Sequence, residues 1–116
     1  MVCDLTGFAA SVYMRGTGLE LFPTTLLAMT DASVGGKTGI DFGGYKNIVG
    51  SFYPARRVYM AVELLETLPE REYRSGLAEV IKHALLGNRK LFELLENRRD
   101  DILAGRDASL LEEMVY

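Results

Sequence analysis

The chain changes character within residues 65–87, whose sequence is LETLPEREYRSGLAEVIKHALLG. Before this stretch, short apolar runs alternate with glycine and proline. From Glu70 on, apolar residues recur at the spacing of one helical face. Pro69 separates the two patterns, because the residue before a proline avoids helical backbone angles. We therefore predict a helix over residues 72–86 and a domain junction at Leu68–Pro69.

The predicted helix has two different sides. Its apolar stripe consists of Leu77, Val80, Ile81, Ala84 and Leu85. On the other side, Glu79, Lys82 and His83 lie within an arc of roughly 100°. Glu79 and His83 are one turn apart and could share a divalent metal. The alternative is a solvated face with an ion pair between Glu79 and Lys82 and an exposed histidine.

The rest of the second half also has helical patterns. Gly87-Asn88 should end the first helix. A second helix is expected around Leu91–Leu95 and a third around Leu110–Val115, because both regions are apolar at helical spacing and poor in strand formers. We predict that residues 70–116 are all helical.

The first half reads as a mixture of helix and strand. A buried helix is expected over residues 5–14, with Asp4 as its N-cap and Gly16 after its end. Leu19–Phe22 fits a strand that Pro23 ends, because proline cannot donate to a sheet. Thr24 or Thr25 can cap a short helix that reaches Met29. Two further strands are predicted at Ile48–Phe52 and Val58–Val62.

Five glycines between residues 35 and 44 predict an irregular loop of ligand-binding size. Lys37 follows Gly36, so backbone amides and an ammonium could meet an anionic group together. The spacing differs from that of a P-loop, which excludes a nucleoside triphosphate site of that type. A structural turn is the alternative, but Lys46 and Asn47, in a second glycine-bounded stretch, favour ligand binding.

Composition narrows the classes of partner. The chain has 116 residues and a formal net charge of −3, so it lacks the basic excess that nucleic-acid binding requires. Its one cysteine, Cys3, cannot form an internal disulfide, and cytoplasm is the default location. No apolar run is long enough for a membrane span, and no signal peptide is evident. The first helix lacks a preceding strand and the last lacks a C-cap, so both ends are expected to be cut.

Six sequence blocks, in order along the chain, resemble 3-dehydroquinate synthases. They are Asp4–Phe8, Tyr13–Gly16, Pro23–Ala28, Asp31–Gly39, Lys46-Asn47 and Arg74–Lys82. The resemblance extends from about Val2 past Leu95. It implies an α/β fold: the C-terminal part of a Rossmann-like dinucleotide-binding domain (1–69), followed by the first helices of an all-helical metal-binding domain (70–116).

The resemblance also implies roles for individual residues. NAD would be contacted by Asp4, Thr24, Thr25, Lys46 and the stretch Leu64, Leu65, Glu66 and Thr67. The substrate would be held by Asp31, Lys37, Asn47 and Lys82, with Lys37 and Lys82 as the catalytic lysines. Arg15 would reach the substrate of a neighbouring subunit, so the full-length enzyme would be a homodimer. Glu79 would bind the metal, zinc or alternatively cobalt, whereas His83 matches no ligand of the family.

The activity implied is that of a phosphate-eliminating carbon–oxygen lyase of the shikimate pathway, which leads to aromatic amino acids. Such an enzyme converts 3-deoxy-D-arabino-heptulosonate 7-phosphate to 3-dehydroquinate and phosphate with NAD and a metal. The alternatives are a related sugar phosphate cyclase, such as a 2-deoxy-scyllo-inosose or valiolone-type synthase, and a non-catalytic fragment. We expect this chain alone to be inactive, because the pyrophosphate-binding turn and two histidine ligands of the family are missing from it.

Overall fold

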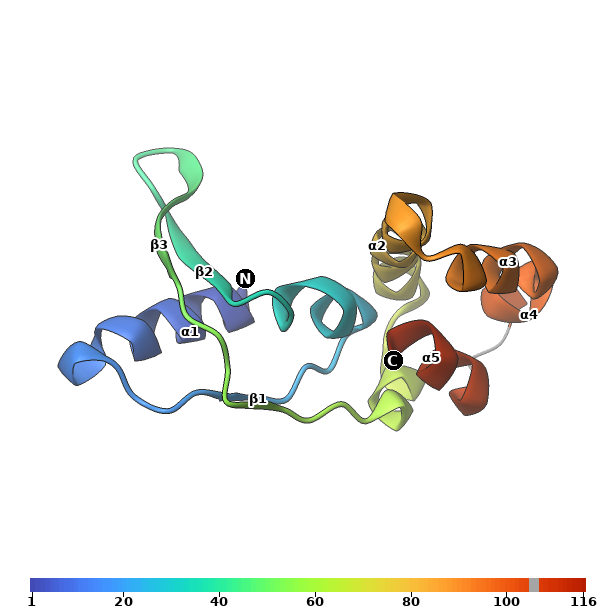
Figure 1. Ribbon diagram of the computed structural model, residues 1–116, viewed down its shortest axis with the longest axis horizontal. Helices are drawn as coiled ribbons and strands as arrows, with labels where there is room; N and C mark the ends of the chain where they lie inside the picture. The colour runs from blue at the N-terminus through green and yellow to red at the C-terminus, as the bar shows by residue number, and fades with distance from the viewer. Residues whose placement is uncertain (105–106) are drawn as a thin grey trace. The chain divides into compact units, whose positions relative to one another are not determined.

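The structure is a computed structural model that describes residues 1–104 and 107–116. It is a mixed α/β chain with two compact units (Figure 1). The first unit contains Met1–Pro23 and Asp31–Met60, and the second contains Thr24–Thr30 and Ala61–Tyr116. No helix within the described ranges is both long and apolar enough to cross a membrane.

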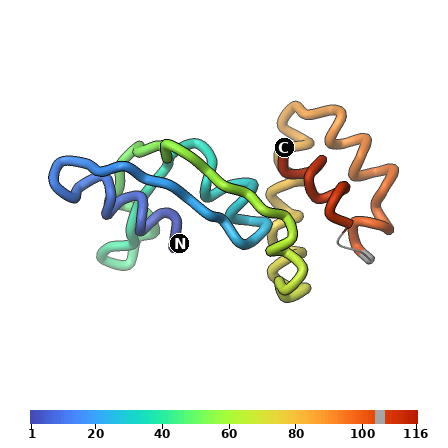
Figure 2. The backbone as a smooth tube through the Cα atoms, turned by 90° about the horizontal axis from the view of Figure 1, so that it is seen from below, coloured from blue at the N-terminus to red at the C-terminus, as the bar shows by residue number. Residues whose placement is uncertain are grey.

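The first unit begins with helix α1 (Val2–Val12), which passes into the 3₁₀ turn η1 (Tyr13–Arg15). Strand β1 (Glu20–Leu21) pairs in parallel with β4 (Arg57–Val58). Around this short ladder, the amides of Arg56 and Tyr59 donate to carbonyls of the β1 segment at 2.8 and 2.9 Å. Figure 2 shows these two stretches of chain running side by side.

Strands β2 (Lys37–Phe42) and β3 (Tyr45–Phe52) form an antiparallel hairpin. Gly43 and Gly44 make its tip at φ +61° and +83°, the left-handed angles that a tight hairpin turn of this kind requires. The register shifts between Ile40 and Phe42, which indicates a bulge. The predicted irregular loop over residues 35–44 was therefore wrong. Glycines in a hairpin turn and within its strands give the same sequence pattern as glycines in a loop.

Helix α1 packs closely on the hairpin. A side chain at Gly7 would collide with Thr38 Cγ2 on β2, so only glycine allows this approach. A chain of hydroxyl groups joins the same elements: Ser51 Oγ donates to Ser11 Oγ at 2.8 Å and lies 2.9 Å from Thr38 Oγ1. Steric fit and hydrogen bonding together fix α1 on the hairpin.

The second unit is built from helices. After the 3₁₀ helix η3 (Val62–Thr67) come α2 (Glu70–Gly87), α3 (Arg89–Asn97), α4 (Arg99–Ala104) and α5 (Ala108–Val115). The π-helical turn η2 (Ala28–Ala32) lies at the change from one unit to the other along the chain. The most buried side chains include Leu26, Leu65 and Val80, with exposed fractions of 0 to 1%.

The close packing of α2 on the Thr24–Thr30 segment depends on Gly76. A Cβ at this position would lie 2.6 Å from Leu26 Cβ and 2.8 Å from the backbone nitrogen of Leu27. Both distances are too short for any side chain, and a backbone atom cannot rotate away. Gly76 therefore allows a contact between segments that are far apart in the sequence.

Several sequence predictions agree with the structure. The helix expected over residues 72–86 is α2, with Pro69 as its N-cap, and it ends at Gly87. Asn88 then caps α3, because its Oδ1 accepts the amide hydrogen of Leu91 at 3.1 Å. The strand predicted at Leu19–Phe22 is β1, and the third predicted helix is α5. Every element described between Glu70 and Tyr116 is helical.

Other predictions were wrong in detail. Helix α1 begins before Asp4, with Met1 as N-cap, and its Val2, Leu5 and Val12 are exposed rather than buried. The strand expected at Val58–Val62 ends at Val58, and a 3₁₀ helix begins at Val62. Helix α4 was not predicted. In the apolar stripe of α2, Ile81 is 47% and Leu85 68% exposed, so the buried stripe is narrower than its sequence pattern.

We predict that Gly76→Ala destabilises the chain by about 1–3 kcal/mol, because the new methyl group overpacks the contact with Leu26. The effect should appear although alanine favours a helix by about 1 kcal/mol over glycine. Urea unfolding followed by circular dichroism measures the free energy of unfolding.

The matched control is Ser75→Ala, one residue earlier on the exposed side of α2. Its free energy of unfolding should stay within roughly 0.5 kcal/mol of that of the unaltered chain. A more stable Gly76→Ala chain would contradict the close contact.

Candidate functional site

The candidate site residues are divided between the two units. Asp4, Arg15, Asp31, Lys37, Lys46 and Asn47 belong to the first unit, and Thr24, Thr25, Leu64–Thr67, Glu79 and Lys82 belong to the second. Each group is described within its own unit.

A pocket of about 350 Å³ in the first unit brings three of the candidates together. Asp4 of α1, Lys37 at the start of β2 and Asn47 of β3 line it, together with backbone and side chains of the hairpin around Gly39 and Gly50. The two glycines are partners across the hairpin. This pocket therefore combines a carboxylate, an ammonium and an amide beside backbone that carries no side chain. Such a set suits a ligand that has both hydroxyl groups and an anionic group.

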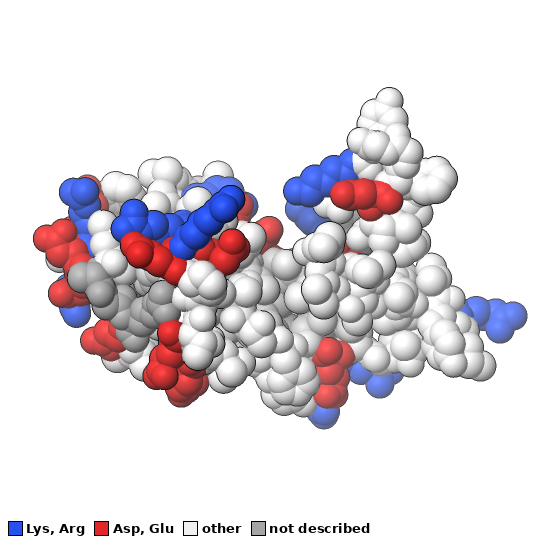
Figure 3. Space-filling view, turned by 180° about the vertical axis from the view of Figure 1, so that it is seen from behind, with Lys and Arg blue, Asp and Glu red and all other residues white. Residues whose placement is uncertain are grey.

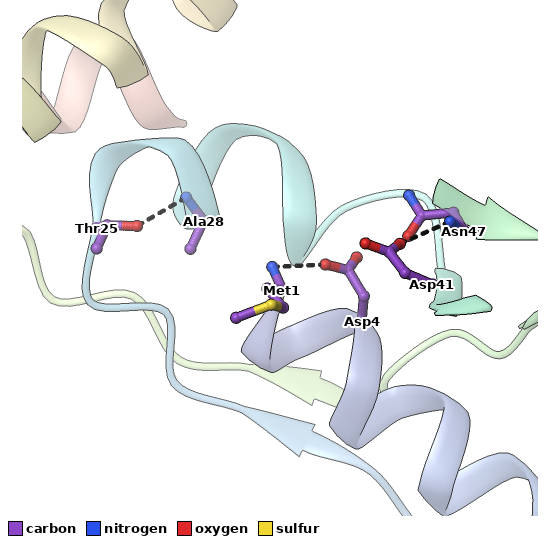
Figure 4. A network of polar contacts seen from close by, with 6 residues as sticks. All are labelled: Met1, Asp4, Thr25, Ala28, Asp41 and Asn47. Atoms are coloured by element: carbon purple, nitrogen blue, oxygen red, sulfur yellow. Dashed lines mark hydrogen bonds and ion pairs between the residues drawn. The ribbon is translucent and has the colours of Figure 1, made fainter. Parts of the chain in front are cut away.

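Asp4 lies in the first turn of α1, where a carboxylate interacts favourably with the positive end of the helix dipole. Its Oδ2 atom is 2.8 Å from the amino group of Met1, as Figure 4 shows. The side chain is 25% exposed, so it keeps access to the pocket. Its position differs from the N-cap expected from sequence, because the helix starts earlier.

Cys3, next to Asp4, is partly buried. Burial raises the pKa of the Cys3 thiol, and the negative charge of Asp4 raises this pKa further, whereas the N-terminal amino group lowers it. Because the thiolate is the reactive form, Cys3 is less nucleophilic at neutral pH than an exposed cysteine.

Asn47 adopts an unusual backbone conformation. Its φ is +51°, and its backbone N–H donates to Asp41 Oδ1 at 2.8 Å (Figure 4). The left-handed angle is one that asparagine tolerates better than most residues. Asp41 follows Ile40 at the bulge, so a side chain at the bulge holds the backbone of Asn47 through this hydrogen bond. The contribution of Asp41 was not predicted from the sequence.

The other charged candidates of the first unit are solvent-accessible. Asp31, Lys37 and Lys46 are exposed. The carbonyl of Asp31 accepts from the amide of Val34 at 2.9 Å, which closes the turn that precedes Gly35. Figure 3 shows one face of the projecting hairpin, with charged atoms beside uncharged surface. Phe42, Tyr45, Ile48 and Phe52 account for much of its exposed apolar surface.

Arg15 is exposed on a turn with three successive positive φ angles: +48° at Met14, +68° at Arg15 and +111° at Gly16. Two residues other than glycine in this region carry backbone strain. The turn is closed by hydrogen bonds from Gly16 N–H to Tyr13 O (2.8 Å) and from Thr17 N–H to Ala10 O (3.0 Å).

In the second unit, Thr25 is the helix cap that the sequence predicted, because its Oγ1 accepts the amide hydrogen of Ala28 at 3.1 Å (Figure 4). Thr24 is exposed, and Thr25 rather than Thr24 is the cap. The stretch Leu64–Thr67 forms most of η3. Leu65 is fully buried, whereas Leu64, Glu66 and Thr67 are exposed, so only these three residues are accessible to a ligand.

Glu79 and Lys82 form an ion pair one turn apart on α2. The Glu79 side chain is 26% exposed, and its buried Oε2 atom is the oxygen that Lys82 Nζ contacts. Because the ammonium occupies this oxygen, a metal would have to displace Lys82 or bind the other carboxylate oxygen. No group of three metal-binding side chains occurs in ranges 1–104 and 107–116, and His83 is exposed. The metal role of Glu79 therefore stays a prediction.

Comparison with known proteins shows which family the chain belongs to. Residues 1–75 match the family described as 3-dehydroquinate synthase N-terminal. The chain belongs to the 3-dehydroquinate synthase family. It is 49% identical over 115 residues to the 3-dehydroquinate synthase of Dictyoglomus thermophilum, and 47% identical over 115 residues to that of Sulfurisphaera tokodaii. Each match covers 99% of this chain and 32% of the relative, so the chain spans about a third of their length.

Solved structures of the same fold carry related names. A 2-epi-5-epi-valiolone synthase from Streptomyces hygroscopicus subsp. jinggangensis, with NAD⁺ and Zn²⁺ bound, superposes with a TM-score of 0.86 and is 38% identical. That match covers 97% of this chain and 32% of the other. A 2-deoxy-scyllo-inosose synthase with carbaglucose-6-phosphate, NAD⁺ and Co²⁺ gives 0.65 at 34% identity, over 68% of this chain and 22% of the other. The mixed α/β fold is thus that of the sugar phosphate cyclases of this family.

We predict that Asp4→Asn lowers the pKa of the Cys3 thiol, because a neighbouring negative charge disfavours the thiolate. The unaltered chain should reach its half-maximal alkylation rate at a higher pH than the same chain unfolded in urea, and Asp4→Asn should move that pH downward. The rate of alkylation by iodoacetamide, followed by mass spectrometry, reports Cys3 alone since the chain has one cysteine.

Asp41→Asn is the matched control, because it removes one carboxylate from the hairpin rather than from the turn that holds Cys3. It should leave the alkylation profile unchanged. If both variants shifted the profile equally, net charge rather than the position of Asp4 would explain the shift.

Proposed function

We propose that this chain is the middle part of a 3-dehydroquinate synthase, which converts 3-deoxy-D-arabino-heptulosonate 7-phosphate to 3-dehydroquinate and phosphate in the shikimate pathway. The observation that carries the proposal is the pocket shared by Asp4, Lys37 and Asn47, in a chain that belongs to this family. In this proposal residues 1–69 are part of a Rossmann-like NAD-binding domain, and residues 70–116 begin an all-helical metal-binding domain.

In the proposed enzyme, Asp4, Thr24, Thr25, Lys46 and Leu64–Thr67 hold NAD, and Glu79 is one ligand of the zinc or cobalt ion. The cofactor and the metal together supply reversible hydride transfer at a polarised substrate alcohol. The carboxylate of Asp4 is suited to ribose hydroxyls, because an ionised carboxylate only accepts hydrogen bonds. The assignment of Glu79 as a ligand is supported by the family to which the chain belongs, since a carboxylate oxygen is a usual zinc ligand.

The charged residues account for substrate binding. The exposed ammonium of Lys37 can face a carboxylate or phosphate, and the side-chain amide of Asn47 can donate to a further substrate oxygen. Asp31 accepts from substrate hydroxyls. Lys82 supplies fixed positive charge, both to Glu79 and to negative charge that develops on the substrate. Arg15, on its exposed turn, is assigned to the substrate of a second subunit in a cytoplasmic homodimer.

A second candidate is another sugar phosphate cyclase, and the similarity to a valiolone synthase with a TM-score of 0.86 favours it. The residues that bind NAD and metal would keep their roles, and only the substrate would differ. The identities of 47–49% to 3-dehydroquinate synthases place this reading second. A third reading, a non-catalytic fragment, predicts self-association through exposed apolar side chains such as Phe42 and Phe52.

The 116-residue chain, incubated with NAD, zinc and 3-deoxy-D-arabino-heptulosonate 7-phosphate, should release no phosphate above the uncatalysed rate. A hybrid enzyme, in which the chain replaces the matching segment of the Dictyoglomus thermophilum relative, should release phosphate. Within the hybrid, Lys37→Ala should lower kcat/KM about 10²–10³-fold, because it removes a charge that stabilises the transition state.

Lys90→Ala is the matched control, since Lys90 is an exposed lysine of α3 outside the proposed site, and kcat/KM should not change. Rapid turnover by the isolated chain would overturn its expected inactivity. If the hybrid folds and binds NAD but releases phosphate only from other phosphorylated sugars, the second candidate replaces the first.

A further inference from the structure

The turn that presents Arg15 and the turn that precedes Lys37 meet at one residue, Tyr53. Its hydroxyl donates to the carbonyl oxygen of Thr17 at 2.6 Å, and its backbone amide donates to the carbonyl oxygen of Gly36 at 2.7 Å. Tyr53 follows the last residue of β3, so its position is set by the hairpin. Tyr53 is half-buried. Its side chain is hydrogen-bonded to the turn that presents Arg15, and its backbone is hydrogen-bonded to the turn that precedes Lys37.

The hydroxyl of Tyr53 also fits closely against Gly16. A Cβ at Gly16 would lie 2.9 Å from Tyr53 Oη and 3.6 Å from two carbons of its ring. Gly16 therefore provides both the positive φ angle of the turn and the space for the phenol. A larger residue at position 16 would separate the turn from the ring.

The turn needs this support because its backbone is strained. Met14 and Arg15 both have left-handed backbone angles. These angles are unfavourable for residues other than glycine, so surrounding contacts must offset their free-energy cost. Two backbone hydrogen bonds close the turn from within, at Gly16 and Thr17. The side-chain hydrogen bond from Tyr53 ties the turn to the residue that follows β3.

We infer that Tyr53 is a positioning residue, whose hydroxyl holds the left-handed turn at Met14–Gly16 and so fixes the direction of Arg15. The inference rests on the proposed function in one respect, the assignment of Arg15 to substrate. The geometric part does not depend on it. Tyr53 touches neither the reacting atoms nor the substrate in this assignment, and acts through Arg15.

The geometric part is tested on the 116-residue chain by limited digestion with trypsin. Cleavage after Arg15 requires the turn to open, so its rate reports local stability. Tyr53→Phe should raise this rate about fivefold, the effect expected for loss of one hydrogen bond. Cleavage after Lys46, in the hairpin of the same unit, serves as an internal reference and should not change. Equal acceleration at both sites would overturn the inference, since it would mean general loosening of the unit.

Tyr59→Phe is the matched control. It removes a hydroxyl from another tyrosine of the first unit, whose ring stays stacked on Phe22 at a centroid distance of 4.6 Å. Cleavage after Arg15 should be the same in this variant as in the unaltered chain. Acceleration by Tyr59→Phe equal to that by Tyr53→Phe would count against a specific role for Tyr53.

The functional part is tested in the hybrid enzyme by a double-mutant cycle. Tyr53→Phe should raise KM for the sugar phosphate about threefold to tenfold with a smaller change in kcat, whereas in an Arg15→Ala background it should have no further effect. Additive effects of the two substitutions would overturn the role through Arg15. If Arg15→Ala alone leaves the kinetics unchanged, the substrate assignment of Arg15 fails, while the trypsin result still decides whether Tyr53 holds the turn.

Discussion

The missing side chain at Gly76 is the constraint on which the second unit depends. Helix α2 can lie against Leu26 only because no Cβ intervenes, and Leu26 is fully buried as a result. The short Thr24–Thr30 segment thus joins the helices although the chain on either side of it belongs to the first unit. Thr25 caps this segment, so a candidate cofactor residue is placed by the same contact.

The helical half could be largely predicted from sequence because its stability comes from burying one face. That requirement produces the regular spacing of Leu77, Val80 and Ala84, and the caps at Pro69 and Asn88 mark the ends. The hairpin could not be recognised in the same way. Its strands contain glycine where one strand closely approaches the other, and Gly50 would collide with the Thr38 carbonyl if it carried a side chain. In sequence, such positions are indistinguishable from those of a loop.

The candidate site shows a similar division. Resemblance to the family identified Asp4, Lys37 and Asn47, and the structure brings these three residues to one pocket. Nothing in the sequence indicated that Asp41 holds the Asn47 backbone or that Tyr53 contacts Thr17. These contacts depend on the register of the hairpin and on a bulge, which are set by pairing between strands rather than by any local motif. The roles of the site residues therefore remain proposals that the pocket supports.

The left-handed angles at Met14 and Arg15 lower local stability, but they also determine where the guanidinium of Arg15 lies. Glycine or asparagine would adopt these angles at lower free energy, so replacement of Arg15 by either residue is a way to relax the backbone. Selection for thermal stability alone would favour such replacements and would remove the guanidinium from the surface. Directed evolution of this segment for heat resistance would therefore need a second selection, for function, to keep position 15 as arginine.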